Sequence, residues 1–506
     1  MKALLSVYDK TGVVAFARSL QKTGMDLVST GGTHKALSDA GLPVQQVSEL
    51  TGSPEILDGR VKTLHPIIYG GILARRDNPE HLSELKALQM DTIDLVAGNL
   101  YPFASTIART GVTLDEALEN IDIGGPTMIR AAAKNFPFVI VVVDPNDYLW
   151  VAERITAGDL TIEERQGLAQ KAFQHVAFYD TLIAGYMRGQ DDGFGQELTL
   201  GYGKLYDLRY GENPHQQAAF YGDSSPSGIA GAKQLHGKEL SFNNILDADA
   251  AWRAVSDFKE PAAAVIKHTN TCGLACHDDQ EEAYKRAFSG DPVSAYGGIV
   301  AFNRPVTGET AEAMRQVFYE IVLAPEFEPA ALDILTKKRD LRILALGESG
   351  AVNGKSGEVR QVSGGVLIQS PDVLEEDPQS WQVVTDRKPT QEELLDMAFA
   401  WKAVKHVKSN AIVIAKDQTL LGMGAGQPNR IISVQLSLKA AGEASKGAVL
   451  ASDAFFPFAD GLETGAEGGV TAVVHPGGSI RDGEVIEAAN RLGLAMVFTG
   501  VRHFRH

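Results

Sequence analysis

Short apolar runs alternate with helix-like patterns over residues 1–145 of the chain. The apolar runs predict strands at residues 3–7, 27–29, 93–97 and 138–143. The patterns between them predict helices at residues 13–20, 34–40 and 127–133. This alternation is typical of a mostly parallel sheet covered by helices, and the turns from strand to helix form the ligand-binding edge of such a sheet.

A helix and a linker follow, and they divide the chain into two regions. Apolar residues at helical spacing predict a helix at residues 162–179, and the Gly- and Asp-rich segment 188–197 predicts a domain boundary. We therefore expect an α/β domain at residues 1–195 and a second α/β region at residues 196–506. Within the second region, the Gly- and Ser-rich residues 345–365 predict an exposed loop.

The second region contains two segments that resemble each other. Its apolar runs predict strands at residues 262–266, 298–302, 411–415, 448–452 and 470–474. A strand followed by a turn occurs at residues 262–273 and again at 410–426, and a Ser/Asp-aromatic stretch follows each, which indicates an internal duplication. Between them, Thr390 and Glu393 form a capping-box pattern that predicts a helix at residues 390–405.

Composition and charge narrow the classes of function. No apolar stretch approaches the roughly 20 residues that span a bilayer, so we expect no membrane segment. The formal net charge of −17 argues against general binding to nucleic acid or anionic membranes, which needs a basic face. The chain has two cysteines, Cys272 and Cys276, which cannot form a disulfide framework and favour a reduced, cytoplasmic setting.

Four turns of the first domain have the composition of a phosphate-binding site. They are SVYDKTG from Ser6, STGGT from Ser29, GRVKTLHP from Gly59 and DIGGPTMIRAAAKN from Asp122. Small residues before a helix N-terminus let backbone N–H groups approach a phosphate, which the helix dipole also favours. Each turn alone is ordinary turn chemistry, but four in one small domain predict a phosphorylated ligand. None matches a P-loop, and no Gly-x-Gly-x-x-Gly follows the first strand.

Polar side chains near these turns extend the candidate site. The cations placed to balance a phosphate are Lys10, Arg60 and Lys62. Asn99 and Tyr101 directly follow the strand at residues 93–97, the position expected to face a ligand. Lys134 lies at the end of a predicted helix, where it is either a solvent-exposed lysine or a proton carrier.

In the second region, an apolar strand leads directly into a polar turn within AAAVIKHTNTCG. The strand ends in the adjacent Lys267 and His268, an arrangement that can hold a base rigidly at the rim of a site. The same dipeptide also fits a strand-end lysine beside a histidine with satisfied nitrogens. Other motifs supply arginines and stacking faces for an anionic, flat heterocycle, namely LRYGENPHQ, GMGAGQPNR and SDAFFPF. Of these, GMGAGQPNR at residues 422–430 is predicted to be a Gly-rich loop that ends in an arginine.

Motifs for two other chemistries are absent from the sequence. The chain has no Cys-x-x-Cys, no His-Glu-x-x-His and no clustered His/Asp triad, so we expect no catalytic metal. No Gly-x-Ser-x-Gly follows a strand, which argues against a serine nucleophile.

Together these motifs resemble a family of bifunctional purine-biosynthesis enzymes. In that family, aminoimidazole carboxamide ribonucleotide (AICAR) formyltransferase is joined to inosine monophosphate (IMP) cyclohydrolase. The motifs SVYDKTG, STGGT, GRVKTLHP, GNLYPF and DIGGP are similar to its cyclohydrolase half. The motifs LRYGENPHQ, IKHTNTCG, DPVSAYGG, SNAIVIA, GAGQPNR, SDAFFPF and VRHFRH are similar to its formyltransferase half, so the resemblance covers essentially the whole chain. One departure is Thr271, where the family often has proline.

The resemblance implies both a fold and two reactions. It implies a methylglyoxal-synthase-like parallel-sheet domain, followed by two cytidine-deaminase-like α/β subdomains without zinc. A formyl group would pass from the co-substrate 10-formyltetrahydrofolate to the 5-amino group of AICAR, and formyl-AICAR would then close to IMP with loss of water. The expected partners are these small molecules and a second copy of the chain, because the family's formyltransferase sites lie between the subunits of a homodimer.

For the cyclohydrolase half, the resemblance makes Lys134 the proton donor or acceptor. Its candidate catalytic partners are Lys62, Tyr101 and Asp122. The residues expected to bind the substrate are Ser6, Lys10, Thr11, Gly12, Ser29, Gly31, Gly32, Thr33, Arg60, Thr63, Asn99, Ile123, Gly124 and Gly125.

For the formyltransferase half, His268 is the expected general base for the amine. Lys267 would stabilise the developing oxyanion, and Asn410 would hold the carboxamide or the formyl group. The residues expected at AICAR, some of them bridging to the folate, are Arg209, Tyr210, Gly297, Glu320, Phe455, Asp460 and Arg502. Those on the folate side are Arg430, placed to meet the anionic folate tail, with Ile431, Ser479 and Ile480.

Three other functions fit parts of the sequence. A methylglyoxal-synthase-like lyase accounts for the first domain alone, and would release phosphate from dihydroxyacetone phosphate. A zinc deaminase accounts for the second region, but the ligand residues are missing. A nucleotide sensor would bind AICAR or IMP and need neither folate nor His268.

Overall fold

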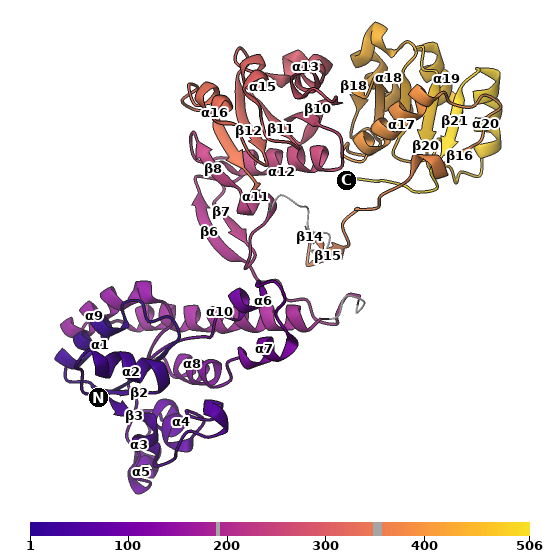
Figure 1. Ribbon diagram of the computed structural model, residues 1–506. Coiled ribbons are helices and arrows are strands. Elements are labelled where there is room, and N and C mark those ends of the chain that lie inside the picture. The colour runs from indigo at the N-terminus through magenta and orange to yellow at the C-terminus, as the bar shows by residue number, and fades with distance from the viewer. Residues whose placement is uncertain (189–192, 348–356) are drawn as a thin grey trace. The chain divides into compact units, whose positions relative to one another are not determined.

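The structure of the protein, a computed structural model, describes residues 1–188, 193–347 and 357–506 (Figure 1). Internal contacts divide the chain into two units. Unit 1 comprises Met1–Gly203 and Asp223–Ser225, and unit 2 comprises Lys204–Gly222 and Pro226–His506. The main division therefore follows residue 203, whereas the sequence placed it after residue 195. Residues 189–192 of the predicted linker lie outside the described residues.

Unit 1 is built on a five-stranded sheet in the order β3-β2-β1-β4-β5. Its strands are β1 (Lys2–Val7), β2 (Asp26–Ser29), β3 (Gln45–Gln46), β4 (Leu95–Asn99) and β5 (Ile140–Val142). Every pair is parallel, so the carboxyl ends of all the strands lie at one edge. The register pairs Leu5 with Ser29 and Val7 with Asn99, which makes the ends of β2, β1 and β4 neighbours.

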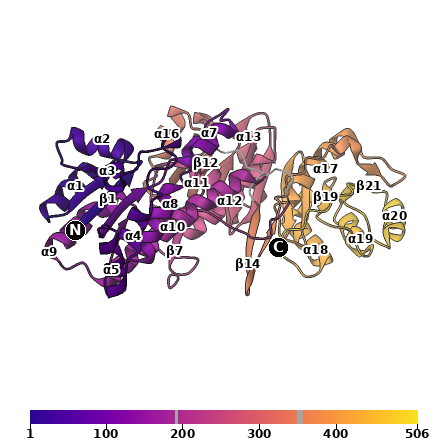
Figure 2. The same cartoon turned by 90° about the horizontal axis from the view of Figure 1, so that it is seen from below.

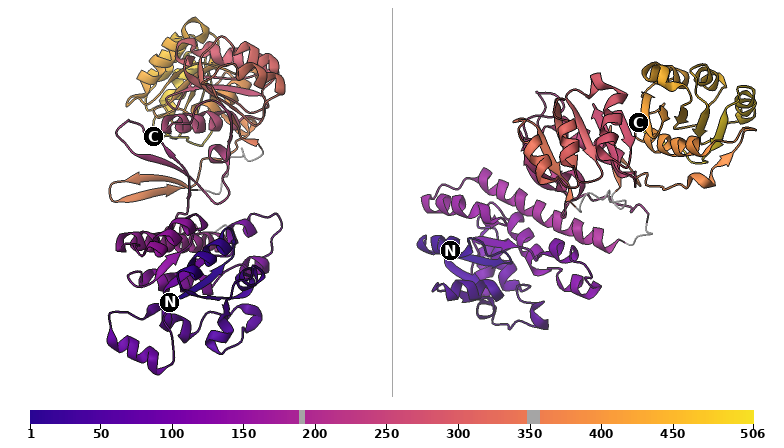
Figure 3. Two further views of the ribbon diagram at one scale, coloured as in Figure 1. Left: turned by 90° about the vertical axis from the view of Figure 1, so that its left-hand side faces the viewer. Right: turned by 45° about the horizontal axis from the view of Figure 1, so that its top comes forward.

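Helices surround this sheet and bury its apolar strands. They are α1 (Val13–Lys22), α2 (Gly31–Asp39), α3 (Val47–Thr51), η1 (Leu57–Gly59), α4 (Pro66–Leu73), α5 (Pro79–Ala87), α6 (Phe103–Ile107), α7 (Leu114–Glu119), α8 (Gly124–Lys134), η2 (Pro145–Asp147), α9 (Tyr148–Ala157) and α10 (Ile162–Met187). Helix α8 packs against β4 and β5, and the long α10 runs beside α8 (Figures 2 and 3). Helix α10 starts at a capping box of Thr161 and Glu164 and extends beyond the predicted residues 162–179.

Unit 2 contains a twelve-stranded sheet in the order β16-β21-β20-β19-β17-β18-β10-β9-β11-β12-β13-β8. Its strands are β8 (Lys233–His236), β9 (Ala262–Lys267), β10 (Asn270–Cys276), β11 (Gly298–Phe302), β12 (Tyr319–Ala324), β13 (Arg342–Ala345), β16 (Gln382–Val383), β17 (Ile412–Lys416), β18 (Thr419–Gly424), β19 (Val449–Ser452), β20 (Ala472–His475) and β21 (Ala495–Phe498). Two hairpins lie outside the sheet, β6 (Gly203–Leu208) with β7 (Ala218–Gly222) and β14 (Glu358–Val362) with β15 (Gly365–Gln369).

The twelve strands form two halves with the same topology. In the first half the order is β10-β9-β11-β12-β13-β8, and in the second it is β18-β17-β19-β20-β21-β16. The parallel and antiparallel pairings also agree strand by strand. The halves join where β10 pairs antiparallel with β18 through Ala275 and Thr419. This confirms the internal duplication that the sequence indicated.

The helices of unit 2 also repeat between the halves. They are α11 (Gly228–Gly231), α12 (Phe242–Ser256), α13 (Gln280–Gly290), α14 (Pro292–Ala295), α15 (Gly308–Ala313), α16 (Pro329–Leu335), η4 (Pro378–Ser380), α17 (Gln391–Val404), α18 (Arg430–Ala441), η5 (Gly442–Ser445), α19 (Asp460–Glu467) and α20 (Asp482–Arg491). Helices α12 and α17 each precede the first strand of a hairpin, and the predicted capping box of α17 is present. No described helix is long and apolar enough to cross a membrane.

Two expectations about loops in this region were wrong. The Gly-rich residues 422–430 were expected to form a loop, but they begin inside β18 and end at the first residue of α18. The glycine is needed there because a Cβ on Gly424 would lie 2.1 Å from the Ser433 carbonyl oxygen of α18. The expected loop at residues 345–365 contains β14, while residues 348–356 lie outside the described residues.

Candidate functional site

In unit 1, polar side chains join the ends of three neighbouring strands. Asn99, at the end of β4, accepts hydrogen bonds from the backbone N–H groups of Tyr8 (2.6 Å) and Asp9 (2.9 Å), which follow β1. Thr33 of α2 accepts from the N–H of Val7 at 3.0 Å and donates to its carbonyl at 2.9 Å. These bonds fix the turns after β1 and β2 to one another. The predicted sheet edge is therefore a single rigid surface.

The N-terminus of α2 lies at this edge together with two lysines. A Cβ on Gly32 would lie 3.5 Å from Nζ of Lys10, and one on Gly31 would lie 3.7 Å from Nζ of Lys62. The hydroxyl of Thr30, the residue before the helix, donates to Glu55 at 2.7 Å and does not cap the first N–H groups. Two ammonium groups beside uncapped N–H groups can bind a phosphate.

A second cluster connects Lys62 with Tyr101 and Asp122. Lys62 donates to the Tyr101 hydroxyl at 3.5 Å, and Asp122 accepts from the N–H of Gly125 at 2.8 Å. Burial raises the pKa of Asp122, while the N–H of Gly125 and the charge of Lys62 act against that rise. A Cβ on Gly124 would lie 2.7 Å from the Thr63 hydroxyl, so the close approach requires glycine.

The other predicted residues of unit 1 border these clusters. Gly12 precedes α1 with φ 70°, Ser29 donates to the Leu5 carbonyl at 2.7 Å, and Arg60 forms an ion pair with Glu119. Ser6 pairs with Gly98 in the sheet. The remaining two are Thr11, after β1, and the exposed Ile123, before α8.

Lys134 lies at the opposite end of α8 from Asp122. It is exposed and borders an open cavity of about 280 Å³ that Tyr69, Thr127 and Phe173 also line. Among the contacts of the described residues, none joins Lys134 to Lys62, Tyr101 or Asp122. Tyr69 lines the same cavity as Lys134 and is also influenced by the charge of Asp122. Burial raises the pKa of Tyr69 to about 12, and the charge of Asp122 adds to the rise.

In the first half of unit 2, Lys267 and His268 occupy the hairpin between β9 and β10. Nζ of Lys267 donates to the carbonyl of Tyr296 at 2.5 Å. The next residue, Gly297, has φ 70°, and a Cβ there would lie 3.3 Å from that Nζ. Lys267 is thus held beneath the loop that precedes β11, and His268 extends from the turn.

The other predicted residues of this half have structural partners. Glu320 of β12 forms an ion pair with Arg342 at 2.7 Å. Arg209 and Tyr210 follow β6, and the guanidinium of Arg209 lies 5.7 Å from the centre of the Tyr210 ring.

In the second half, Asn410 is held by a buried arginine. Arg430 is 7% exposed and forms an ion pair with Asp453, which is fully buried. It also donates to the side-chain oxygen of Asn410 at 2.8 Å, while Asn410 donates to the Gln427 carbonyl at 2.9 Å. The charge of Arg430 is therefore neutralised inside the protein. Its guanidinium also contacts the side chain of Asn410, and the expected role of Arg430 on the folate side stays a prediction.

The C-terminal residues pack against the same cluster. The N–H of His503 donates to the carbonyl of Asp453 at 3.2 Å, and the carbonyl of Arg505 accepts from the N–H of Ser409 at 2.8 Å. Arg502, between the packed residues, is exposed with its guanidinium 4.3 Å from the Phe504 ring centre. The other predicted residues lie in α18, at or before α19, and before α20, and they are Ile431, Phe455, Asp460, Ser479 and Ile480.

The structure thus gathers the predicted formyl-transfer residues into two groups. Lys267, His268 and Gly297 lie in the first half of unit 2, and Asn410 and Arg430 lie in the second half. Within the described part of the chain, no hydrogen bond or ion pair joins the two groups. Nor do the described residues contain a cluster of three His, Cys, Asp or Glu side chains arranged for a metal ion.

Asp453 and Tyr179 are among the residues of these sites that the sequence did not reveal. Asp453 lies within the SDAFFPF motif. A carboxylate next to the aromatic residues of a candidate site is the sequence feature that could have identified it. Tyr179 of α10 accepts from the N–H of Asp122 at 2.8 Å and donates to the Asn120 carbonyl at 2.9 Å. It is far from Asp122 in the sequence, so no local pattern reveals this role.

We predict that the C-terminal packing weakens in alkaline solution. Burial lowers the pKa of His503, but Asp372 (2.6 Å) and Glu376 (3.1 Å) outweigh burial and raise it to about 9. This stabilisation is complete below pH 6.5, the ordinary pKa, and is lost as the pH rises through about 9, on the order of 3 kcal/mol. Urea unfolding at pH 6.5 and pH 9.5 measures the loss, and His503→Gln should make it smaller. Equal pH dependence in both proteins would contradict the assignment.

Comparison with known proteins places this geometry in a family. The family described as "AICARFT/IMPCHase bienzyme" matches residues 132–440, and an "MGS-like domain" matches residues 12–127. The Bifunctional purine biosynthesis protein PurH of Acetivibrio thermocellus is 52% identical over 511 residues, covering 100% of this chain and 99% of that protein. The protein of the same description from Dictyostelium discoideum is 50% identical over 542 residues, with complete coverage of both.

One solved structure, the crystal structure of ForH, is 38% identical to part of this chain. It covers 36% of this chain and 95% of its own, with a TM-score of 0.34. The family matches confirm the resemblance read from the motifs and the methylglyoxal-synthase-like fold expected for the N-terminal domain. The chain belongs to the family of AICARFT/IMPCHase bienzymes, the bifunctional enzymes of purine biosynthesis.

Proposed function

We propose that the two units divide two consecutive reactions, formyl transfer in unit 2 and ring closure in unit 1. Family membership makes the chain a formyltransferase and cyclohydrolase of the last two steps of purine biosynthesis. The observation that carries the division is the separation of two kinds of site. The sheet edge with Lys10 and Lys62, which we expect to bind the phosphate, lies in unit 1. His268, the proposed base at the end of a strand, lies in unit 2.

For ring closure, the phosphate of formyl-AICAR would lie at the N-terminus of α2 beside Lys10 and Lys62. The carboxamide nitrogen then attacks the formyl carbon, and the formyl oxygen leaves as water with one proton from that nitrogen and one from the 5-formamido nitrogen. Lys62 donates to the Tyr101 hydroxyl and its charge acts on Asp122, and these three residues would move the protons. The reacting groups belong to one molecule, so positioning supplies much of the reduction in barrier.

For formyl transfer, the 5-amino group of AICAR attacks the formyl carbon of 10-formyltetrahydrofolate. His268 would take the proton that the amine loses, and the folate nitrogen gains a proton as its bond to the formyl carbon breaks. Lys267, fixed against the Tyr296 carbonyl, would stabilise the oxyanion, and Asn410 would hold the carboxamide or the formyl group. This assignment keeps two cytidine-deaminase-like subdomains as the scaffold, without zinc.

We propose that a second copy of the chain completes the formyl-transfer site. Val293 and Tyr296, in the segment that holds Lys267, are large apolar residues with 86% and 64% of their surface exposed. We take these two exposed apolar side chains as part of the surface that would meet the second copy. Light scattering should give the mass of a dimer, and dilution below the dimer dissociation constant should abolish formyl transfer while ring closure persists. A fully active monomer would contradict this proposal.

The whole assignment is tested by turnover of the full chain in vitro. Incubation with AICAR and 10-formyltetrahydrofolate should yield IMP and tetrahydrofolate. The formation of both products is monitored by absorbance. Release of phosphate from dihydroxyacetone phosphate would instead favour a lyase, and nucleotide binding without turnover would favour a sensor. We place these reactions in the cytoplasm, since both cysteines are free and buried.

Lys134 remains our proposed proton carrier for ring closure, on the strength of the family resemblance. The cavity beside Lys134 is lined by residues within the 127–134 segment of α8, whereas Asp122 precedes the N-terminus of that helix. Lys134 would therefore act through the ligand or through Tyr69, and not through a direct contact with Asp122. We expect Lys134→Ala to slow ring closure of added formyl-AICAR by about 10²-fold, the lower end for a positioned proton carrier. Full cyclization with an unchanged Michaelis constant would assign the proton transfers to Lys62, Tyr101 and Asp122 instead.

A further inference from the structure

The hairpin that carries His268 has an unusual turn, and the duplicated half repeats it. His268 and Thr269 have φ 52° and 59°, and they form a two-residue loop between Lys267 and Asn270. Asp417 and Gln418, in the equivalent hairpin of the second half, both have φ 51°. Turns of this kind favour Asn and Gly, and a β-branched residue such as Thr269 is a poor occupant. Other contacts must therefore hold the backbone in this shape.

A carboxylate from the preceding helix holds each of these turns. Asp247 of α12 accepts the N–H of Thr269 at 2.7 Å, and the N–H of His268 also helps to stabilise its charge. Asp396 of α17 accepts the N–H of Gln418 at 2.7 Å and that of Asp417 at 3.0 Å. Burial raises the pKa of both carboxyl groups, and the backbone N–H groups oppose the rise. The two aspartates thus occupy equivalent positions and make the same kind of contact.

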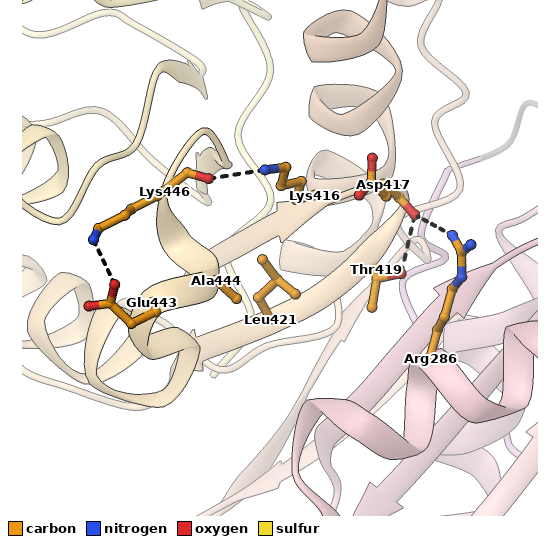
Figure 4. Close-up of a pocket in the computed structure, with 8 residues that line it drawn as sticks. All are labelled: Arg286, Lys416, Asp417, Thr419, Leu421, Glu443, Ala444 and Lys446. Atoms are coloured by element: carbon orange, nitrogen blue, oxygen red, sulfur yellow. Dashed lines mark hydrogen bonds and ion pairs between the residues drawn. The ribbon is translucent and has the colours of Figure 1, made fainter.

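The lysine before each turn is equivalent as well. Figure 4 shows the second half, where Lys416 donates to the Lys446 carbonyl at 3.1 Å, as Lys267 does to Tyr296. Each acceptor precedes a glycine with positive φ, Gly447 (73°) or Gly297 (70°). The scaffold is therefore common to both hairpins, and the residue after the lysine distinguishes them. That residue is His268 in one half and Asp417 in the other.

We propose that Asp247 is a positioning residue that holds the imidazole of His268 in its working direction. In this turn, the backbone at residues 268 and 269 sets where the side chain of His268 leaves the hairpin. Asp247 fixes that backbone through Thr269 and touches none of the reacting atoms. This proposal rests on the proposed function, since it takes His268 as the base for formyl transfer. Asp396 makes the same contact in a hairpin that carries no such base, and is the matched control.

The test compares Asp247→Ala with Asp396→Ala in the full-length chain. A misplacement of about 1 Å can cost about 10²-fold in rate, so we expect Asp247→Ala to lower kcat for formyl transfer by about that factor. The Michaelis constant for AICAR should stay near its wild-type value, because the nucleotide contacts remain. Asp396→Ala should keep the wild-type kcat, although both variants should lower the melting temperature by similar amounts. Ring closure by unit 1 should be unchanged in both.

The outcomes separate this proposal from the proposed function. Wild-type kcat in Asp247→Ala, or an equal loss in both variants, would overturn the positioning role. His268→Ala is measured in parallel, and if it kept full formyl transfer, the assignment of His268 and this proposal would both fail. Should Asp247→Ala not fold, Asp247→Leu replaces it, because its side chain is of similar shape and offers no acceptor to either N–H group. An unchanged kcat in that variant would equally overturn the proposal.

Discussion

Replacing His268 by alanine should lower the rate of formyl transfer by about 10²–10⁴-fold, the range for loss of a positioned general base. The amine of AICAR is a weak nucleophile and must lose a proton as it attacks. Within the described hairpin at residues 262–276, His268 is the only histidine and there is no carboxylate. Ring closure of added formyl-AICAR by the same protein should proceed at the wild-type rate, because the sheet edge proposed to bind its phosphate belongs to unit 1. Absorbance assays of the two half-reactions measure both effects.

The duplicated fold provides a matched control for this variant. Asp417 occupies the equivalent position in the second hairpin, with the same positive φ and a similar aspartate contact. We expect Asp417→Ala to leave formyl transfer unchanged. Equal losses in His268→Ala and Asp417→Ala would show that disturbing the sheet, and not removing a base, slows the reaction. Loss of both half-reactions in His268→Ala would contradict the separation of the two sites.

Local patterns predicted the elements that are apolar and continuous. The strand expected at residues 298–302 is β11 (Gly298–Phe302), which is buried along its length. The strand expected at residues 3–7 differs from β1 by one residue at its start. A run of buried aliphatic residues leaves few alternatives, because both faces of a central strand are covered.

Elements that depend on distant partners were not predicted. The glycines of β18 made its sequence look like a loop. They are present because α18 packs closely against them, and this tertiary contact cannot be read from the local sequence. β12 and β13 were also missed, and the pairing of β10 with β18 that joins the halves has no signal in either strand alone. The faint likeness of residues 262–273 and 410–426 was the visible part of this symmetry.

The candidate site shows the same division between local and long-range information. Lys267 and His268 could be singled out as candidates because their strand and turn are contiguous in the sequence. The support of each site comes from other elements: Asp247 from α12 holds the turn, and Asp453 neutralises Arg430. A carboxylate's partner depends on the tertiary fold, so the sequence alone did not reveal that Asp453 pairs with Arg430.

Replacing Lys62 by alanine should lower kcat/KM for ring closure by about 10²–10³-fold, the range for removal of a preorganised electrostatic contact. Lys62 is the cation shared by both clusters of unit 1. Its ammonium lies 3.7 Å from a Cβ placed on Gly31, at the phosphate end, and 3.5 Å from the Tyr101 hydroxyl. Its charge also opposes the rise in the pKa of Asp122 that burial causes. The variant should therefore lose both phosphate affinity and proton transfer.

The measurement is the initial rate of IMP formation from added formyl-AICAR over a range of substrate concentrations. An increase in KM alone would mean that Lys62 serves only the phosphate, whereas a fall in kcat as well would place it in the proton-transfer cluster. Lys86→Ala, an exposed lysine in the last turn of α5, is the matched control for loss of one positive charge and should behave as wild type. Formyl transfer, carried by unit 2, should be unaffected in both variants. If Lys62→Ala closed the ring at the wild-type rate, Lys62 would be excluded from the proton transfers of ring closure. Lys134 would then be the remaining candidate for that chemistry.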